Sequence, residues 1–504
     1  MSFPKQRELS DITEFLNMYL KKNKEKIFYM SEFKKKQISY SKLLIIIKNF
    51  LIIVSKFKLN PQDKIMIICD NSENLVLIFL SILYHKLIFV PVNPSITRIE
   101  LDYILKKTNP KLIITNKLLA KKLKIKNSLF LIESYEKIKT LNINTLHNKN
   151  KIYSKNKDLI SQILFTSGST GNPKGVILTH QSMLHNLYGI FNSIKIKGKN
   201  LNFLSITPLY HNNGQFIPTL LPILIGGKTL SISPDSSLIN FWPICKKFKI
   251  NYSSVMATHI NYFNSSKKIK HNLKALFCGG AKLDIENHKT FEKKFNIKVL
   301  CNYGLTETSS IACTESVINR SYKYGSVGKP LFNNEIKILK KKQDKFGEII
   351  IKGKNIFKEY LDDKKTTKKT IIGKWLYTGD LGYFDKKGFL YIKDRIDNMI
   401  LVSGENIYPS EIENVVYKFK KIRLGVVTSI PDKITQNKLI LIYEANKKIN
   451  YAEMYKFLSK KLSKYKIPKI ILSCDEIGIK QIPKAANKKV LRKKLKLIVS
   501  ELFK

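Results

Sequence analysis

The feature that most constrains the fold is an alternation of short apolar runs with longer amphipathic stretches in the first part of the chain. The runs that read as buried strands lie at residues 64–69, 88–92, 111–115, 255–256 and 276–278, and the stretches with helical spacing lie at 40–58 and 73–85. Strands that alternate with helices predict layered α/β subdomains with mostly parallel sheets. We therefore predict an α/β fold for a large N-terminal domain.

The pattern changes twice towards the C-terminus. From about residue 323 to 394, short apolar runs alternate with glycine and aspartate turns, which predicts a small β-rich subdomain. After residue 395, strand and helix patterns mix in a compact tail. We expect an N-terminal domain at 1–394 and a small, mobile α+β lid domain at 395–504.

The formal net charge of +52 raises the question of a nucleic-acid partner. Only six of the 90 basic residues are arginines, and the lysines are spread along the whole chain. A dispersed lysine excess is more typical of a solvated basic surface than of a dedicated binding stripe. We expect no specific nucleic acid, and a noncatalytic nucleic-acid-binding protein stays open as an alternative of another class.

Cysteine spacing and hydropathy bear on the compartment. The six cysteines form neither CxxC pairs nor a Cys/His metal spacing, which predicts reduced thiols in a cytoplasmic protein. The N-terminus has no apolar signal region. The apolar segment at 43–54 is too short to span a membrane and is interrupted by Lys48. We interpret it as a buried amphipathic helix, with an interfacial helix in peripheral contact with a membrane as the alternative.

The stretch FTSGSTGNPKG at 165–175 could be a phosphate cradle or a flexible hairpin loop. It lies between two runs that can form strands, at 159–165 and 176–178. Its glycines let backbone N–H groups approach an anion, its hydroxyls can donate to phosphoryl oxygens, and Lys174 supplies a positive charge. It is not a Walker loop, because Lys174 is followed by Gly175 and not by serine or threonine.

Five further motifs follow this loop. They are GGAKL at 279–283, NYGLTETS at 302–309, YTGDLG at 377–382, DRIDNMILVSGENIYPSEIE at 394–413 and PKAANKKVLRKKL at 483–495. In this order they resemble the superfamily of adenylate-forming ligases, which includes acyl-CoA synthetases, aryl-acid ligases and nonribosomal-peptide adenylation domains. The resemblance covers residues 40–495. It implies ATP-dependent activation of a carboxylic acid to an acyl-adenylate with release of pyrophosphate, and then transfer to the thiol of CoA.

The resemblance also implies a site for ATP and Mg²⁺. A carboxylate that attacks the α-phosphate brings two anions together, so positive charge and a metal must offset their repulsion. Thr166 and Glu307 are implied as magnesium ligands, because both offer hard oxygen atoms. The residues implied to bind ATP are Thr166, Ser167, Gly168, Ser169, Thr170, Gly171 and Lys174 of the loop, Gly280, Ala281, Asn302, Tyr303 and Gly304 near the adenine, and Thr306, Asp380, Arg395 and Lys489 near the phosphates and ribose.

The lid motifs imply a catalytic lysine and a hinge. The stretch PKAANKKVLR resembles the family pattern P-x-x-x-N-G-K-[IV]-x-R, which implies that Lys489 bridges the substrate carboxylate and the α-phosphate. Lys488 stands where the family has glycine, so a slip of this assignment to Lys488 stays open. Asp397 is implied as the hinge, and Ser403 and Gly404 as the border of the thiol tunnel. The lid would present the lysine first and then rotate to let the thiol attack.

The stretch PLYHNNGQ at 208–215 resembles the acyl-pocket motif of the family. It implies a catalytic role for His211, near the carboxylate or gating the thiol tunnel, with a structural histidine in a turn as the alternative. Asn212, Gly279 and Gly304 are implied to line the pocket, where small glycines leave room for more than acetate. No acidic residue is present there to hold a substrate ammonium, so we expect a fatty or an aromatic acid. The acceptor is CoA or, alternatively, the phosphopantetheine of an acyl carrier protein.

Overall fold

The computed structural model describes residues 9–30, 37–125, 129–141, 159–166, 173–196, 198–232, 234–267, 269–318, 323–340, 344–403, 405–432, 434–484 and 490–503. The chain forms two compact units. Unit 1 comprises residues 1–336 and 351–376, and unit 2 comprises residues 337–350 and 377–504. Unit 2 therefore includes a large part of the segment that was predicted as a β-rich subdomain.

The first sheet of unit 1 has the strand order β18-β8-β7-β4-β3-β5-β6. Its strands are β3 (Lys64–Ile68), β4 (Ile88–Val92), β5 (Leu112–Thr115), β6 (Leu129–Leu131), β7 (Ile160–Thr166), β8 (Lys174–Thr179) and β18 (Glu359–Tyr360). Strands β3 to β7 pair in parallel, whereas β7 and β8 form an antiparallel hairpin and β18 runs antiparallel to β8. The prediction of a mostly parallel sheet is confirmed.

The second sheet of unit 1 has the order β13-β12-β11-β9-β10-β1-β2. Its strands are β1 (Ile27–Met30), β2 (Gln37–Ser39), β9 (Asn202–Ser205), β10 (Lys228–Ser231), β11 (Tyr252–Met256), β12 (Ala275–Gly279) and β13 (Lys298–Cys301). All pairs are parallel except β1 with β2. Because parallel strands end at the same edge, the loops that follow β9, β12 and β13 leave the sheet on one side.

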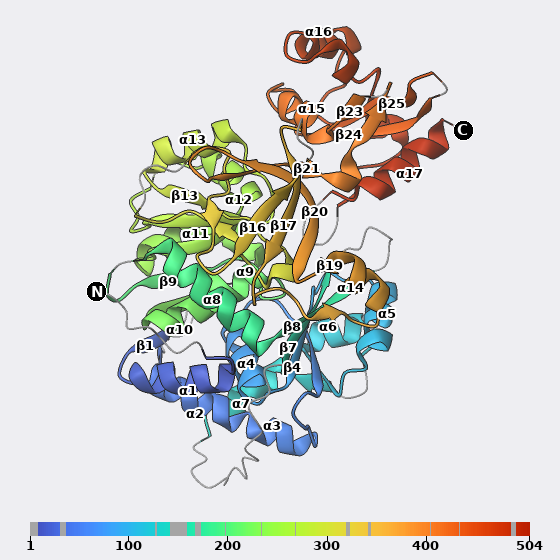
Figure 1. The fold of residues 1–504 in the computed structure, drawn as a ribbon. Helices are drawn as coiled ribbons and strands as arrows, with labels where there is room; N and C mark the ends of the chain where they lie inside the picture. Colours follow the sequence, from blue (N-terminus) through green and yellow to red (C-terminus); the bar gives the residue numbers. More distant parts are fainter. Residues whose placement is uncertain are drawn as a thin grey trace. The chain divides into compact units, whose positions relative to one another are not determined.

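Helices cover both sheets of unit 1 (Figure 1). They are α1 (Ile12–Lys22), α2 (Tyr40–Asn49), α3 (Leu51–Lys56), α4 (Glu73–Tyr84), α5 (Arg98–Thr108), α6 (Lys117–Lys122), α7 (Tyr135–Lys139), α8 (His180–Ile194), α9 (Asn212–Gln215), α10 (Leu221–Ile225), α11 (Pro234–Lys247), α12 (Ala257–Ser265), α13 (Ile285–Phe295) and α14 (Lys364–Thr370). Short strands β14 (Cys313–Thr314), β15 (Lys329–Pro330) and β19 (Ile371–Ile372) complete the unit. Helix α4 is buried from Leu75 onward, and Ser72 caps it by accepting a hydrogen bond from the Leu75 amide at 3.2 Å.

The helix predicted at 40–58 is broken at Phe50 into α2 and α3. Leu43 and Ile46 of α2 and Ile53 of α3 are buried in a hydrophobic core cluster of unit 1. This burial confirms the interpretation of the apolar segment as a core helix over the interfacial alternative. Within the described ranges, none of the helices combines the length and the apolar character that a membrane crossing requires.

Unit 2 has two adjacent parts. The first contains β16 (Glu335–Leu339), β17 (Gly347–Lys352), β20 (Trp375–Phe384) and β21 (Leu390–Arg395), and the second contains β22 (Ile400–Val402), β23 (Glu405–Ile407), β24 (Leu424–Asp432), β25 (Gln436–Glu444), β26 (Ile470–Ser473), α15 (Pro409–Val416), α16 (Tyr451–Ser459) and α17 (Arg492–Leu502). Strands β24, β25 and β26 form one sheet. Val427 and Leu441 pack with residues of α15 and α16, whereas Val426 and Ile440 pack with residues of α17. Alternation along the strands thus gives this sheet a core on each face.

Candidate active site

The residues predicted to surround the adenine and the acyl group lie in loops at one edge of the second sheet. Residues 279–281 lie at the end of β12, residues 302–307 follow its parallel neighbour β13, and residues 211–213 lie at the start of α9, in the connection after β9. The amide of Asn302 donates to the carbonyl of Cys278 at 2.8 Å, so the first two loops begin side by side. Ligands of open parallel sheets bind at this carboxyl edge.

The chain after β13 is held by its own hydrogen bonds. The amide of Tyr303 donates to the carbonyl of Cys313 at 3.0 Å, and Oγ1 of Thr314 donates to Oδ1 of Asn302 at 2.6 Å. Tyr303 and Asn302 are both buried. These bonds fix the main chain on which the two predicted adenine contacts stand.

The glycines at this edge are required for different reasons. A Cβ at Gly304 would collide with the carbonyl of Ser310, so glycine is needed for the close approach of two backbone segments. The space beside Gly304 is already filled by the chain, and the expectation that its small size opens the acyl pocket is wrong. A Cβ at Gly279 would lie 2.9 Å from Nδ2 of Asn213, whereas Gly280 has a φ of 82° and open space beside it.

The loop that carries His211 combines a neutral imidazole with an unsatisfied amide. Burial lowers the pKa of His211 to about 4, so its ring is neutral at pH 7. Asn212 is buried, and neither Oδ1 nor Nδ2 has a hydrogen-bond partner among the described residues. A buried amide without partners costs free energy, so Asn212 is suited to bind a polar group of a ligand. Oγ of Ser310 donates to Oδ1 of Asn213 at 3.3 Å, which adds two residues that sequence reasoning missed.

The hairpin of β7 and β8 presents the two ends of the predicted phosphate loop. Thr166 and Lys174 are opposite each other in the antiparallel register, and both side chains are half-buried. Ser167, Gly168, Ser169, Thr170 and Gly171 lie outside the described residues. A Cβ at Gly175 would lie 3.0 Å from Cβ of Leu361, so this glycine lets the hairpin pack closely against the segment after β18.

One tyrosine contacts two residues that were predicted to act on ATP. The hydroxyl of Tyr360 donates to Oε1 of Glu307 at 2.8 Å, and Nζ of Lys174 lies 5.3 Å from the centre of the Tyr360 ring. Glu307 and Thr306 stand in a short 3-10 turn, Thr306–Thr308, and the Glu307 carbonyl accepts from the amide of Phe357 at 2.8 Å. The structure therefore brings Lys174 and Glu307 together, and Tyr360 is a residue that sequence reasoning missed.

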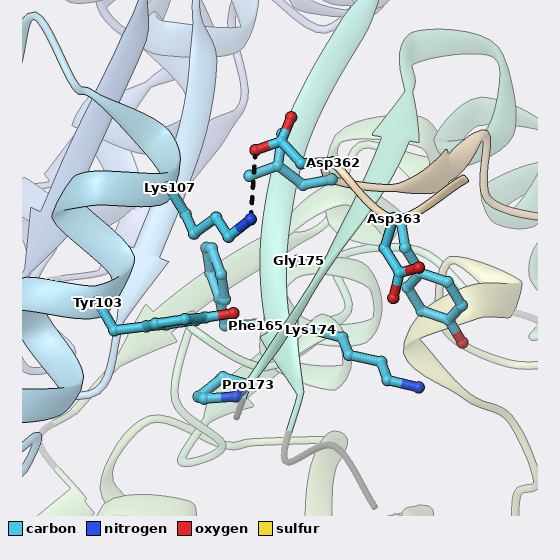
Figure 2. Close-up of a pocket in the computed structure, with 10 residues that line it drawn as sticks. Tyr103, Lys107, Phe165, Pro173, Lys174, Gly175, Asp362 and Asp363 are labelled. Atoms are coloured by element: carbon cyan, nitrogen blue, oxygen red, sulfur yellow. Dashed lines mark ion pairs between the residues drawn. The ribbon is translucent and has the colours of Figure 1, made fainter. Parts of the chain in front are cut away.

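A pocket of about 230 Å³ lies against the base of this hairpin (Figure 2). Lys107 reaches toward Asp362, with 3.7 Å between Nζ and Oδ2, whereas Lys174 extends away on the side of Asp363. A hydrogen bond from Thr366 lowers the pKa of Asp363, and the charges of Lys174 and Lys107 act in the same direction. The base of the loop is thus lined by both acidic and basic side chains.

Unit 2 brings together the two residues predicted near the ribose. Asp380 and Arg395 are partners in the β20–β21 register, and Nη1 of Arg395 lies 3.2 Å from Oδ1 of Asp380. The same guanidinium donates to the carbonyl of Thr378 at 3.1 Å and lies 3.9 Å from Oδ2 of Asp397, the predicted hinge. Asp380 is buried and its charge is paired, which fixes the carboxylate in one position. Ser403, predicted at the thiol tunnel, has a φ of 50°.

The segment of the predicted catalytic lysine is anchored at both of its described ends. Lys489, Lys488 and Gly404 lie outside the described residues. Lys484 and Val490 form an antiparallel bridge. Arg492 donates to both carboxylate oxygens of Glu413 at 2.7 and 2.6 Å and to the carbonyl of Val427 at 3.1 Å. This bidentate pair, in which Glu413 is buried and Arg492 half-buried, joins the start of α17 to α15 and β24.

Sequence comparisons identify the family of this chain. The model of the AMP-binding enzyme family matches residues 17–361. A 2-succinylbenzoate–CoA ligase of Bacillus cereus (strain Q1) is 33% identical over 348 residues, which is 68% of this chain and 70% of that protein.

Solved structures give the same fold. The o-succinylbenzoate CoA synthetase (MenE) of Bacillus subtilis in complex with its acyl-adenylate intermediate superposes with a TM-score of 0.84 at 24% identity, over 96% of this chain and 97% of that one. ATP-bound MatB of Rhodopseudomonas palustris superposes with a TM-score of 0.85 at 19% identity, over 98% of this chain and 100% of that one. The predicted α/β architecture with a second α+β unit is therefore confirmed as the fold of this group of enzymes.

Proposed function

This chain belongs to the AMP-binding enzyme family, and we propose that it ligates an aromatic carboxylic acid to CoA through an acyl-adenylate. It is an AMP-forming acid–thiol ligase that uses ATP, Mg²⁺ and CoA. One observation carries the mechanism: Lys174 and Glu307, far apart in sequence, meet at Tyr360. A cation and a carboxylate that lie close together at the end of the predicted phosphate loop can bind a metal–nucleotide complex.

Two observations support an aromatic over a fatty acid. The 33% identical relative acts on 2-succinylbenzoate by name, and the buried amide of Asn212 lacks partners among the described residues. An aromatic acid with polar substituents can satisfy this amide, whereas the tail of a fatty acid cannot. We therefore infer an aromatic acid that carries a second polar group, and 2-succinylbenzoate is the first compound to test.

We assign the phosphates and the metal to unit 1. Thr166 and Glu307 offer hard oxygen atoms of the kind that magnesium prefers, and two side chains suffice for an ion that keeps phosphate and water ligands. The described residues contain no cluster of three or more His, Cys, Asp or Glu side chains that could hold a metal alone. When bound, Mg²⁺ offsets the negative charge of the phosphates. Lys174 and Thr306 are assigned to phosphoryl oxygens, together with Ser167, Gly168, Ser169, Thr170 and Gly171 of the loop.

We assign the nucleoside to two sets of residues. Tyr303, Asn302, Gly304, Gly280 and Ala281 are assigned to the adenine, because they stand on the fixed backbone at the carboxyl edge of the sheet. In unit 2, the carboxylate of Asp380 is assigned to the ribose hydroxyls. Its pairing with Arg395 orients it as an acceptor.

The reaction needs a cation at the attacked phosphorus and an oriented acid. Lys489 is assigned to the bridge between the substrate carboxylate and the α-phosphate, where charge develops. His211 remains neutral at pH 7, so it can position the carboxylate by a hydrogen bond without adding charge. We propose that Asp397 is the hinge about which the lid, residues 395–504, turns between the two steps, and that Ser403 and Gly404 then border the path of the thiol.

Free CoA is the acceptor supported by the CoA-ligase relatives, and no observation favours a carrier protein. Because the chain belongs to the AMP-binding enzyme family, the hypothesis of a noncatalytic nucleic-acid-binding protein has no support, since only the net charge favoured it. We place the reaction in the cytoplasm, where ATP and CoA are both available.

Acid-dependent ATP–pyrophosphate exchange tests this proposal. The panel contains 2-succinylbenzoate, benzoate, a medium-chain fatty acid, a long-chain fatty acid and an amino acid, and the best acid is then tested for thioester formation with CoA and with a holo carrier protein. We expect exchange with an aromatic acid and a thioester with free CoA. Exchange with fatty acids alone would overturn the substrate class, and no exchange with any acid would overturn the enzymatic assignment.

A further inference from the structure

We propose that Tyr360 is a positioning residue for the activation step, holding Glu307 for the metal and Lys174 for the phosphates. This inference rests on the proposed function of those two residues and adds a group that acts through them. The evidence is one side chain that contacts both: its hydroxyl bonds to Glu307 at 2.8 Å, and its ring lies 5.3 Å from Nζ of Lys174.

The bond to Glu307 fixes one carboxylate oxygen and leaves the other available. Oε1 accepts the hydrogen bond of Tyr360, whereas Oε2 makes no hydrogen bond within the described part of the chain. A carboxylate held by one oxygen presents the second oxygen in a defined direction. Such outer partners orient metal ligands, and their loss typically costs about 10–100-fold in metal affinity or activity.

The contact with Lys174 holds this lysine without neutralising it. Among the described residues no carboxylate lies within ion-pair distance of Lys174 Nζ, and its contact is the face of the Tyr360 ring. A cation–π contact is weaker than a charge-assisted hydrogen bond to a phosphate oxygen. Lys174 can therefore exchange the ring for a phosphate when ATP arrives, at little cost.

Tyr360 is itself held by the fold. It is 6% exposed, it pairs with Val176 of β8, its amide donates to Oγ1 of Thr367 at 2.9 Å, and its ring lies 4.7 Å from that of Phe357. Because β8 is the strand that returns from the phosphate loop, Tyr360 links that strand to the turn that carries Glu307. A rigid partner of this kind is what positioning requires.

The test separates the hydroxyl from the ring. Tyr360→Phe removes only the bond to Glu307 and keeps the ring under Lys174, whereas Tyr360→Leu removes both contacts. Tyr324→Phe is the matched control, because it removes a tyrosine bond of 2.9 Å to Glu292, outside the proposed site. Binding of Mn²⁺·ATP is measured by electron paramagnetic resonance without any acid, and binding of ATP in EDTA by calorimetry.

We expect Tyr360→Phe to weaken Mn²⁺·ATP binding and to raise the Mg²⁺ concentration for half-maximal exchange by about tenfold or more, with KM for the acid unchanged. Its binding of metal-free ATP stays at the wild-type level, whereas Tyr360→Leu weakens that binding too. Added to Glu307→Gln, Tyr360→Phe has no further effect on metal–nucleotide binding, because the two residues act as one unit. The control behaves as the wild type.

The proposal is overturned if Tyr360→Phe binds Mn²⁺·ATP with wild-type affinity. It is also overturned if Tyr360→Phe still weakens Mn²⁺·ATP binding in the Glu307→Gln background, because that loss would come from a general loss of structure. The binding measurement needs no acid substrate. Failure of exchange with every acid therefore counts against the proposed function, while the role of Tyr360 is still decided by metal–nucleotide binding.

Discussion

Replacing Arg492 by leucine should loosen the β24–β25–β26 sheet of unit 2 and slow adenylation. Arg492 makes two hydrogen bonds to Glu413 and one to the carbonyl of Val427, and the Glu413 side chain is 9% exposed. Without Arg492, the carboxylate keeps the amide of Val427 at 2.8 Å as its hydrogen-bond donor. Breaking a buried pair in this way costs about 3–5 kcal/mol. The Arg492 side chain is 27% exposed, so we expect the lower end of that range.

Hydrogen exchange followed by mass spectrometry measures this effect directly in peptides from α15, β24 and β25. A loss of about 3 kcal/mol corresponds to roughly a hundredfold faster exchange of their protected amides, since each tenfold change is 1.4 kcal/mol. Neither Trp242 nor Trp375 lies in α15, β24 or β25, so their fluorescence serves as an internal control and should not change. Arg492→Lys keeps the charge but cannot make the bidentate bond, and we expect about 1–2 kcal/mol for it.

The same variants test whether the Arg492–Glu413 pair positions residues 485–489, which include the predicted catalytic lysine. The bridge between Lys484 and Val490 and the bonds of Arg492 hold the two ends of residues 485–489. We therefore expect Arg492→Leu to lower acid-dependent exchange at least tenfold while Mn²⁺·ATP binding, whose metal and phosphate ligands are assigned to unit 1, stays at the wild-type level. Unchanged amide protection would refute the energetic reasoning, and faster amide exchange with full adenylation activity would refute the positioning role.

Three further predictions concern unit 1. Burial, reinforced by the charge of Glu292, raises the pKa of Glu315 to about 9, above its value in the unfolded chain, so the stability that its protonated form contributes is lost as pH rises from about 4.5 to 9. Across that window, Glu315→Gln should gain stability over the wild type by at most about 1.4 kcal/mol per pH unit, measured by urea unfolding with tryptophan fluorescence. A pH-independent difference in stability between the two proteins would contradict this. Gly304→Ala should reduce thermal stability and ATP binding because its Cβ meets the Ser310 carbonyl, and a wild-type melting curve would show that the loop can move aside. Asn212→Leu should raise KM for a polar aromatic acid and lower it for an unsubstituted one, measured by exchange kinetics, and equal effects on both acids would exclude a role in recognition.

The sequence predicted the elements that depend on local pattern. The strands at 64–69 and 88–92 were found because an apolar run between turns is a local signal, and the hairpin around the phosphate loop followed from two apolar runs that flank glycines. The break of the helix at Phe50 was missed, because the apolar spacing continues through it and the core decides where the chain turns.

Contacts between residues far apart in the sequence could not be predicted from local sequence patterns. Tyr360 and Glu307 are 53 positions apart, and the residues around one contain no signal for the other. The requirement for glycine at 304 is likewise set by Ser310, which folds back against it, and the sequence alone suggested a pocket instead. Such residues are identified only when the fold places two segments in contact, whereas the adenine loops could be predicted because each directly follows a strand.

The contacts of individual lysines also indicate which cations this chain uses for chemistry. Lys86 and Lys466 pair with carboxylates, Asp11 at 2.9 Å and Glu411 at 2.6 Å, and such pairs hold elements together. A phosphate that recruited either lysine would first have to displace a carboxylate. Lys174 is half-buried and rests on an aromatic ring, so its charge is ordered but not cancelled. Tyr360→Glu, which puts a carboxylate beside Lys174, should therefore weaken the binding of metal-free ATP more than Tyr360→Leu does, and equal affinities for the two variants would refute this role of Lys174.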